Sequence, residues 1–414
     1  MSKNHKVFRE RFVSSQEQTI LSVFVCFGLV SSIALPPLSV YGLGVYIVTF
    51  VSPLLALLVF MFWSKAPVFH FSALFPMLLG LMVCVSALFS WFMGFSSINT
   101  RDLVESIKYF QFFPYLLAIP FLGLKSVDIF HRGLFLSAVV VGCIGFFQVL
   151  GIGEFISRIY LGADSAHLDS LISGRRITLT GSDPNVGGVI AAFFCVYFFS
   201  MYAVSRKFLY VFFSIIFVFL CFLTQSRTAL VALVFALSTY FLFFFRAFIL
   251  YKFVFLVFGF FFLLSMIYFL DLSYLYLGFQ YALEGRNNSL NVRLDNMVDA
   301  YYRFLQSPVV GLGPAKSSFS TIIDSEYALI IQRYGLLGVF LFFCYFVYLL
   351  KLAYSLVCNA WGGSLLIFTL ISFMVMMTNN IFSGYQLMSL VVLLNVACIL
   401  SLRVREAEAK EANL

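Results

Sequence analysis

The segment Asp271–Tyr327 reads DLSYLYLGFQYALEGRNNSLNVRLDNMVDAYYRFLQSPVVGLGPAKSSFSTIIDSEY, and it is the longest polar interruption in an otherwise apolar chain. We call this segment the polar island. Charged side chains crowd within it: Glu284, Arg286, Arg293, Asp295, Asp299, Arg303, Lys316, Asp324 and Glu326. Hydrophobic runs of about 18 or more residues lie on both sides, and a helix of that length crosses a bilayer. The pattern predicts a membrane body that holds one large polar loop at one face.

Composition supports the same class of protein. The chain has 414 residues, of which 62% are hydrophobic and 11% are charged. Its mean hydropathy is +1.01. The strongly alternating ten-residue segments that mark a membrane β-barrel are absent from the sequence. We therefore predict an all-α, polytopic integral membrane protein with a single transmembrane domain over residues 1–414.

Several function classes find no support in the sequence. The eight cysteines lie in or beside apolar runs and none forms a CxxC pair, so neither a disulfide framework nor a zinc site is expected. No HExxH, GxSxG or Walker loop occurs. Most of the net charge of +8 fits the Lys and Arg of cytoplasmic loops. We expect no metal, no cofactor and no nucleic-acid partner.

The apolar runs predict about twelve transmembrane spans. They lie near residues 18–35, 41–63, 70–93, 106–124, 132–150, 186–204, 208–224, 228–245, 250–270, 325–350, 362–382 and 386–402. The fourth of these runs is interrupted by Lys108, Pro114 and Pro120. The polar island falls between the ninth span and the tenth.

The distribution of positive charge sets the orientation of these spans. A basic N-terminal segment lies before the first span, and alternate loops carry Lys65, then Lys125 and Arg132, then Arg206 and Lys207, then Arg246 and Lys252, then Lys351, then Arg403 and Arg405. Cytoplasmic loops are enriched in Lys and Arg. We therefore expect both termini in the cytoplasm, with residues 403–414 as a cytoplasmic tail. Residues 151–185 and 271–324 become long loops on the outer side.

Arginines on the outer side run against this charge bias, and Arg227 is the most informative of them. It lies in a very short loop between two apolar spans, where an arginine is costly unless it is paired or faces a polar cavity. Snorkelling to the interface is the alternative explanation. A guanidinium fork suits phosphate oxygens, and Arg175 or Arg176 would supply a second clamp. These residues favour an anionic ligand such as a lipid-linked pyrophosphate.

Two further segments stand where spans begin. Asp183 is a predicted N-cap before Pro184 and Asn185, and helix N-termini favour anions. Asp324 and Glu326 precede the tenth span. Either acid fits a helix cap or first turn, and either fits a general base that acts on a sugar hydroxyl.

At these positions the chain resembles the superfamily of O-antigen polymerases and O-antigen ligases of bacterial envelopes. Three patches carry the resemblance: Arg175–Asn185 (RRITLTGSDPN), Thr224–Leu230 (TQSRTAL), and Gly311–Gly313 with Asp324–Tyr327 and Tyr334–Gly338. Their order, their spacing and the long outer loop between them also agree. The resemblance covers roughly residues 170–340.

The resemblance implies a GT-C-like fold and a metal-independent, inverting glycosyl transfer at the periplasmic face of the bacterial inner membrane. By position, Arg227 would hold the donor diphosphate, assisted by Arg175 or Arg176. Ligases typically have a His-Asn pair where this chain has Asp324 and Ser325, which favours the polymerase branch. The base remains open between Asp324 and Glu326. Further candidate substrate-contacting residues are Arg101, Arg286, Arg293, Tyr327 and Asn185.

The expected partners follow from that reaction: undecaprenyl-diphosphate-linked oligosaccharides, membrane lipid and a chain-length regulator protein. Two alternatives remain. One is an O-antigen ligase that transfers glycan to lipid A-core. The other is a lipid-linked glycan transporter without chemistry, which would be expected to carry charged or broken helices near mid-membrane. Charges in this chain concentrate at the outer ends of the spans, which favours chemistry at the membrane interface.

Overall fold

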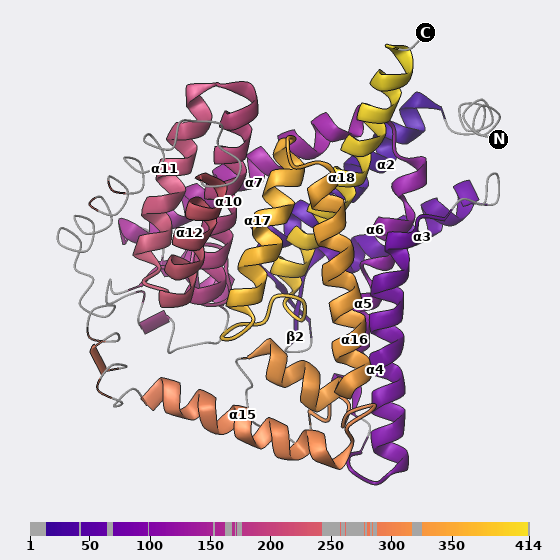
Figure 1. The fold of residues 1–414 in the computed structure, drawn as a ribbon, viewed down its shortest axis with the longest axis vertical. Helices are drawn as coiled ribbons and strands as arrows, with labels where there is room; N and C mark the ends of the chain where they lie inside the picture. The colour runs from indigo at the N-terminus through magenta and orange to yellow at the C-terminus, as the bar shows by residue number, and fades with distance from the viewer. Residues whose placement is uncertain are drawn as a thin grey trace. The chain divides into compact units, whose positions relative to one another are not determined.

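The fold is mostly helical (Figure 1). The structure is a computed structural model, and it describes residues 14–40, 43–63, 69–97, 99–151, 154–161, 176–241, 288–316 and 325–412, together with positions 168, 169, 171, 257, 261, 277, 280, 281 and 284. Within these residues the only strands are β1 (Leu38–Val40) and β2 (Leu43–Val45), which form one antiparallel hairpin with Leu38 opposite Val45.

The chain divides into two compact units. Unit 1 comprises Met1–Val140, Asn296–Leu352 and Asn380–Leu414, and unit 2 comprises Val141–Asp295 and Ala353–Asn379. The single transmembrane domain expected from the sequence stays a prediction.

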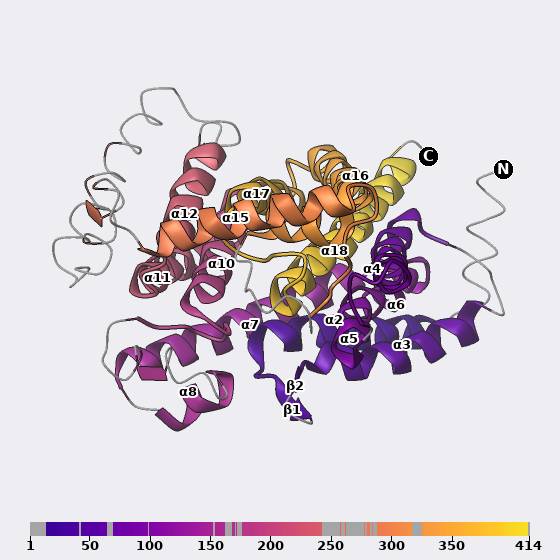
Figure 2. The same cartoon turned by 90° about the horizontal axis from the view of Figure 1, so that it is seen from below.

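Unit 1 is built on the hairpin and on helices from both ends of the chain. These are α2 (Ser15–Ala34), α3 (Ile47–Trp63), η1 (Phe71–Ala73), α4 (Leu74–Phe92), α5 (Thr100–Phe110), α6 (Phe113–Leu117), η2 (Ile119–Phe121), most of α7 (Ser126–Val149), the second half of α15 (Asn288–Gln306), most of α16 (Glu326–Ser355), and α18 (Tyr385–Glu411). The apolar part of α18 is buried almost throughout, and α18 packs against α2. Helices α4 and α5 lie side by side (Figure 2). The Phe110 ring of α5 covers Gly80 of α4.

Unit 2 is organised around α10 (Pro184–Ser205), which packs against α11 (Phe208–Leu223), α12 (Arg227–Thr239) and α17 (Ala360–Val375). The short helix α8 (Glu154–Leu161) also belongs to this unit. Small residues allow the close approach of α10 and α12, because Gly188 of α10 lies directly against Ala229 of α12. Phe193, Phe194 and Phe198 fill the core around α10.

The prediction of an all-α polytopic membrane protein is confirmed. Among the described residues, six helices are long and apolar enough to cross a membrane, and four shorter helices are also apolar. The long ones are α2, η1 with α4, α7, α10, α16 and α18, and the shorter ones are α3, α11, α12 and α17. Each overlaps one predicted span, although the predicted span 41–63 begins with strand β2 and is helical only from Ile47. The total of about twelve spans stays a prediction.

The two remaining predicted spans differ from these ten. Residues 250–270 lie outside the described residues, apart from the single positions 257 and 261. Residues 106–124 do not form one continuous helix but end α5 and continue as α6 and η2. Pro114 and Pro120 stand near the starts of these two short elements, where a residue without an N–H group is tolerated. The predicted tail 403–414 continues α18 to Glu411 without a break.

One glycine in α16 has a clear conformational role. Gly335 has φ 57° and ψ −156°, which interrupts the helix one third of the way along it. The kink frees the backbone to pair with the segment after α15, because the amides of Leu336 and Leu337 donate to the carbonyls of Pro308 and Val309 at 2.9 and 3.0 Å. A side chain at position 335 would meet the Pro308 carbonyl oxygen at 2.7 Å.

The same pairing continues on the other side of the kink. The Leu312 amide donates to the Gln332 carbonyl at 3.0 Å, and the Gly313 amide donates to the Arg333 carbonyl at 2.8 Å. Gly311 and Gly313 have positive φ values of 78° and 66°. The sequence patch that contains Gly311, Gly313 and Gly335 therefore has a structural role. It allows backbone hydrogen bonds between the end of the polar island and α16.

Candidate functional site

In unit 2, residues 224–228 form a tight turn between α11 and α12, with Arg227 as the first residue of α12. Gln225 has a positive φ of 49°, which reverses the chain. Ser226 is the N-cap, and its hydroxyl accepts from the Ala229 amide at 3.3 Å. Arg227 is half-buried, and as the first residue of α12 it stands at the positive end of the helix dipole.

The turn is joined to the N-terminus of α10. The Ser226 hydroxyl donates to the Asn185 side-chain oxygen at 2.9 Å. Asp183 is the N-cap of α10, as predicted, and its carboxylate accepts from the amides of Asn185 and Val186 at 2.7 and 3.0 Å. Two helix N-termini, those of α10 and α12, therefore meet at the Ser226–Asn185 contact.

Arg176 reaches the same turn from the chain segment before α10. Its Nε donates to the Thr224 carbonyl at 3.1 Å, and the Ile177 amide donates to the Leu223 carbonyl at 3.2 Å. Two of the three sequence patches are thus brought together in space. We call Arg176, Asn185 and residues 224–228 the arginine turn.

A residue that the sequence did not single out holds this segment in place. The Gln148 side chain, near the end of α7, accepts from the amides of Thr178 and Leu179 at 3.1 and 2.8 Å. Its amide group donates to the Leu179 carbonyl at 3.0 Å. Leu179 has a positive φ of 54°, so the buried Gln148 pairs the backbone of a strained turn.

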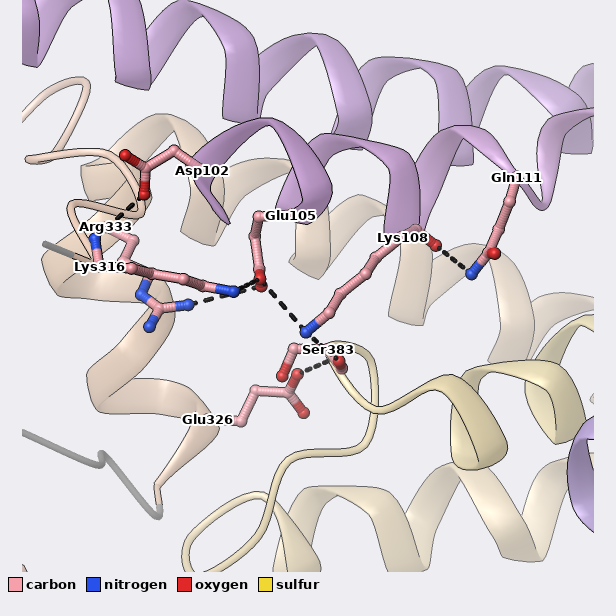
Figure 3. A network of polar contacts seen from close by, with 8 residues as sticks. All are labelled: Asp102, Glu105, Lys108, Gln111, Lys316, Glu326, Arg333 and Ser383. Carbon is pink, nitrogen blue, oxygen red and sulfur yellow. Dashed lines mark hydrogen bonds and ion pairs between the residues drawn. The ribbon is translucent and has the colours of Figure 1, made fainter. Parts of the chain in front are cut away.

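In unit 1, a second polar site is centred on Glu105 of α5 (Figure 3). Three cations converge on its carboxylate: Lys316 Nζ at 2.6 Å, Lys108 Nζ at 3.2 Å and Arg333 NH1 at 3.4 Å. The Glu105 side chain is 1% exposed, and those of Lys108, Lys316 and Arg333 are 21%, 25% and 16% exposed. We call these four residues the Glu105 cluster.

The charge state of Glu105 follows from these neighbours. Burial on its own raises the pKa of this carboxyl, but the three cations outweigh burial and lower the pKa to about 2. Glu105 therefore stays ionised at neutral pH and is a weak base. Its geometry suits a fixed anion that orders the cations around it.

Asp102 and Lys108 attach the cluster to neighbouring segments. One oxygen of the Asp102 carboxylate accepts from the Lys316 amide at 3.0 Å, and the other accepts from the Asn99 amide at the N-terminus of α5. Lys108 Nζ donates to the Ser383 carbonyl at 3.4 Å and lies 5.4 Å from the centre of the Tyr385 ring. The predicted outer loop 271–324 therefore shares one network with the N-terminal part of α5 and with the segment before α18.

Glu326 occupies a distinct position beside this network. Its side chain is fully buried at the first residue of α16. One carboxylate oxygen accepts from the amides of Ile381 and Phe382 at 2.6 and 3.0 Å, and the other accepts from the Ser383 amide at 2.7 Å. These three hydrogen bonds connect the N-terminus of α16 to the segment before α18. We call this structural role of Glu326 a clasp.

The predicted site residues fall into four groups. Arg176, Asn185 and Arg227 come together in the arginine turn. Glu326 and the half-buried Tyr327 lie in unit 1, as do the exposed Arg101 at the start of α5 and the Glu105 cluster. Arg293 is half-buried in the first half of α15, which belongs to unit 2. Asp324, Arg175 and Arg286 lie outside the described residues.

Sequence reasoning assigned none of Glu105, Lys108 and Lys316 to a site. One signal was present: Glu105 and Lys108 are three residues apart, the spacing of a helical ion pair, in a segment that carries more charge than a membrane span tolerates. Nothing in the local sequence indicated Lys316 as a third member, because it lies far along the chain.

Comparison with known proteins found one family model that matches part of the chain. A family model described as O-Antigen ligase matches residues 212–343, which include the arginine turn from its Thr224 onward and both Lys316 and Arg333. The match supports the superfamily of O-antigen polymerases and ligases for this chain, and it does not distinguish the two branches. No curated protein sequence matches the chain.

The family match and the fold together indicate a coarse function. Members of this family are glycosyltransferase-like enzymes of the bacterial inner membrane that act on lipid-linked oligosaccharides. The apolar helices of this chain agree with a membrane protein. The match indicates a polymerase- or ligase-type function in O-antigen and lipopolysaccharide biosynthesis.

Proposed function

We propose that this protein is an O-antigen polymerase, or the polymerase of a related surface polysaccharide. It transfers a growing glycan from one undecaprenyl diphosphate onto a repeat unit held on a second carrier, with inversion at the transferred sugar and without a metal. The reaction takes place at the periplasmic face of the inner membrane, with both termini in the cytoplasm.

The arginine turn is the observation that carries the proposal. Helix N-termini present free N–H groups and a partial positive charge to an anion. Here two such N-termini meet through the Ser226–Asn185 bond, with Arg176 and Arg227 beside them. A departing diphosphate develops negative charge, which suits this combination of dipoles and guanidinium groups.

The acceptor hydroxyl needs a group that takes its proton. The Glu326 carboxylate is fully buried and accepts three backbone hydrogen bonds, so its lone pairs are engaged within the fold. We therefore favour Asp324 over Glu326 as the general base. This assignment narrows the choice that the sequence left open.

The proposed reaction is a direct displacement at C1 of the transferred sugar. The acceptor hydroxyl oxygen attacks C1 of the sugar at the reducing end of the growing glycan, from the face opposite the leaving group. A new C1–O bond forms while the C1–O bond to the diphosphate breaks. The hydroxyl proton passes to Asp324, and undecaprenyl diphosphate leaves with the bonding electron pair, stabilised by Arg227 and Arg176.

Two observations support the choice of branch and of membrane face. The family's ligases typically carry a His-Asn pair where this chain has Asp324 and Ser325, which favours the polymerase. The Glu105 cluster and Glu326 join three loops that the charge pattern assigns to the outer side, and segments in contact lie on the same side of a membrane.

Rescue of the O-antigen ladder in a polymerase-null strain of the source serotype tests the proposal. Wild type is compared with Arg227→Ala, with Asp324→Ala, and with Arg132→Ala as a matched control, because Arg132 is exposed at a predicted cytoplasmic end. We expect wild type and Arg132→Ala to restore the ladder. We expect Arg227→Ala and Asp324→Ala, expressed at equal levels, to leave a single-repeat band.

Two results would overturn parts of the proposal. If wild type fails in that strain but restores glycan attachment in a ligase-null strain, the protein is the ligase. If both site variants restore full laddering, the proposed site is wrong even though the family assignment stands.

A further inference from the structure

Helix α15, within the polar island, exposes a row of apolar side chains. Leu294, Val298, Tyr301 and Leu305 recur at intervals of four, three and four residues, so they lie on one face of the helix. Their exposed fractions are 52%, 52%, 57% and 53%. We call these four residues the α15 stripe. Val309, just past the end of the helix, is also exposed.

The opposite face of α15 is the one that packs against the protein. Asn296, Ala300 and Arg303 each lie two residues after a member of the stripe, which is about 200° around the helix. Ala300 is 1% exposed, and Asn296 and Arg303 are half-buried. A helix on the surface of a water-soluble protein turns its apolar side inward and its polar side to solvent. Helix α15 has the reverse arrangement, which indicates that its outward face does not meet water.

The chain after α15 is hydrogen-bonded to α16 at the point where α16 becomes exposed. The amides of Leu336 and Leu337 donate to the carbonyls of Pro308 and Val309. The described side chains of α16 before this pairing are buried or half-buried. Beyond the pairing, α16 exposes large apolar side chains along one side: Leu336, Phe340, Phe343 and Val347. Because α16 is long and apolar enough to cross a membrane, this side faces lipid.

Helix α4 places the same segment near the end of a second apolar helix. The Ser86 hydroxyl donates to the Val310 carbonyl, and Gly313 lies against the backbone of Ser86 and Ala87. These contacts lie shortly before α4 ends at Phe92, and Trp91 in the last turn is exposed. Tryptophan and tyrosine are enriched where a membrane meets water. The segment after α15 therefore lies at the level of a membrane boundary.

The direction of α15 agrees with this level. Figure 1 shows α15 lying across the direction of α4 and α16, and Figure 2 shows α15 along its length where α4 is seen nearly end-on. Helix α4, most of α16 and the second half of α15 belong to the same compact unit. A helix that lies across membrane-spanning helices is parallel to the membrane plane, as interfacial amphipathic helices are.

The charges of α15 balance. Arg293 and Arg303 are matched by Asp295 and Asp299, so the helix carries no net charge. Membrane binding by an amphipathic helix combines burial of its apolar face with attraction of its cations to anionic lipid. In α15 only the first of these contributions is large, because the second needs a net positive charge.

We propose that α15 is an interfacial helix whose stripe is buried in the lipid at the surface of the membrane. The stripe is then continuous with the lipid-facing side of α16, and the helix holds the end of the polar island against the membrane. The inference rests on the membrane class of the protein and goes beyond the proposed function, because it does not depend on which glycosyl transfer takes place.

Spin-label accessibility tests the inference on the purified full-length protein, with one copy in each phosphatidylcholine nanodisc. A nitroxide is attached to Val298→Cys or to Leu305→Cys. Asp299→Cys is the matched control beside the stripe, and Phe340→Cys on α16 is the lipid-facing reference. The exposed Cys143 and Cys358 are first replaced by alanine, and the signal of that protein without an introduced cysteine is subtracted. Thermal midpoints equal to that of wild type confirm that each variant is folded.

Collision rates with oxygen, which concentrates in lipid, are compared with those of a nickel chelate, which stays in water. We expect oxygen to collide more often than nickel at positions 298 and 305, as at position 340. We expect the reverse at position 299. If positions 298 and 305 behave like position 299, the stripe is in water and the proposal is wrong. If both reagents collide rarely at positions 298 and 305, protein covers the stripe, which also overturns the proposal.

A second set of nanodiscs tests the source of the binding. Phosphatidylglycerol replaces part of the phosphatidylcholine, and the collision rates at positions 298 and 305 are expected to stay the same because α15 has no net charge. A preference for oxygen that appears only with phosphatidylglycerol would mean that anionic headgroups, and not the apolar stripe, hold the helix at the membrane. Failure of the polymerase assignment would change none of these expected results, so the two proposals fail separately.

Discussion

The arginine turn of unit 2 and the Glu105 cluster of unit 1 are built by different means. The arginine turn uses helix caps, a side-chain amide and backbone carbonyls, so its framework contacts are single hydrogen bonds. The Glu105 cluster uses a buried carboxylate that orders three cations. A hydrogen bond contributes about 1 kcal/mol to stability, or about 1.5–3 kcal/mol where one partner is charged, whereas breaking a buried ion pair costs about 3–5 kcal/mol.

Because of this difference, substitutions at the two sites are expected to change different properties of the protein. Substitutions in the framework of the arginine turn are expected to shift the position of Arg227 while the protein remains folded. Substitutions of the central carboxylate in the Glu105 cluster are expected to unfold unit 1. We expect the largest effect on stability at Glu105 and the smallest at Ser226.

Glu105→Ala is expected to have the largest effect. It removes the buried carboxylate that three half-buried cations share, which costs about 3–5 kcal/mol of unfolding free energy. Thermal unfolding in detergent, followed by tryptophan fluorescence, measures the loss. Glu408→Ala on the exposed end of α18 is the control, and it should change stability by less than about 0.5 kcal/mol. Equal midpoints for the two variants would show that the cluster is not held as described.

The stability that the Glu105 carboxylate contributes is expected to depend on pH. The pKa of Glu105 is lowered from its ordinary value of 4.5 to about 2 in the folded protein. A lowered pKa means that the stabilisation is complete above the ordinary value and is lost as pH falls through the folded value. The stability difference between wild type and Glu105→Gln should therefore be constant at neutral pH and shrink between about pH 4.5 and 2. A difference that instead vanishes as pH rises above 7 would contradict the assignment.

Gly335→Ala is expected to come next. The residue has φ 57° and ψ −156°, and an added Cβ would lie 2.7 Å from the Pro308 carbonyl oxygen. Backbone strain of this kind costs about 1–3 kcal/mol, and the contact adds to it. Gly142→Ala in α7 is the matched control, because its Cβ would meet no atom within 4 Å. The control should be neutral or slightly stabilising, and a destabilised control would point to a general intolerance of alanine.

Glu326→Gln is expected to cost about 2 kcal/mol, because hydrogen bonds from the three amides to a charged acceptor are lost or weakened. If Glu326 is a clasp rather than the base, the loss appears in the thermal midpoint while laddering persists at a temperature where the variant is folded. Glu406→Gln, exposed on α18, is the control. Complete loss of laddering in a folded Glu326→Gln variant would return Glu326 to the role of base.

Ser226→Ala is expected to have the smallest effect on stability, about 1 kcal/mol, because it removes one helix N-cap and the bond to Asn185. Its effect on laddering should be larger than its effect on stability, since the position of Arg227 depends on this cap. Ser14→Ala removes the N-cap of α2 and serves as the control without a change in activity. A double-mutant cycle with Asn185→Ala measures the coupling, and strict additivity would mean that the two helix ends are not joined.

Much of the fold was predictable because its signals are local. A run of apolar residues long enough to cross a bilayer indicates a helix whatever the rest of the chain does, and ten predicted spans overlap helices for that reason. The prolines at 114 and 120 also act locally, and the predicted fourth span is broken beside them. The N-cap at Asp183 and the turn before Arg227 were predictable from four or five neighbouring residues.

The sequence by itself determined the membrane class, most spans, the family resemblance and the two arginine-bearing patches, because each depends on residues close together in the chain. Only the tertiary structure decided what Glu105 and Glu326 do. Glu105 meets Arg333 across 228 residues, and Glu326 meets Ile381 across 55. A charged side chain within an apolar sequence needs a partner, but its own neighbourhood does not say which one. The pairing is fixed by which loops the packed helices bring together, and that in turn decides whether a carboxylate is free to act as a base or is held as a clasp.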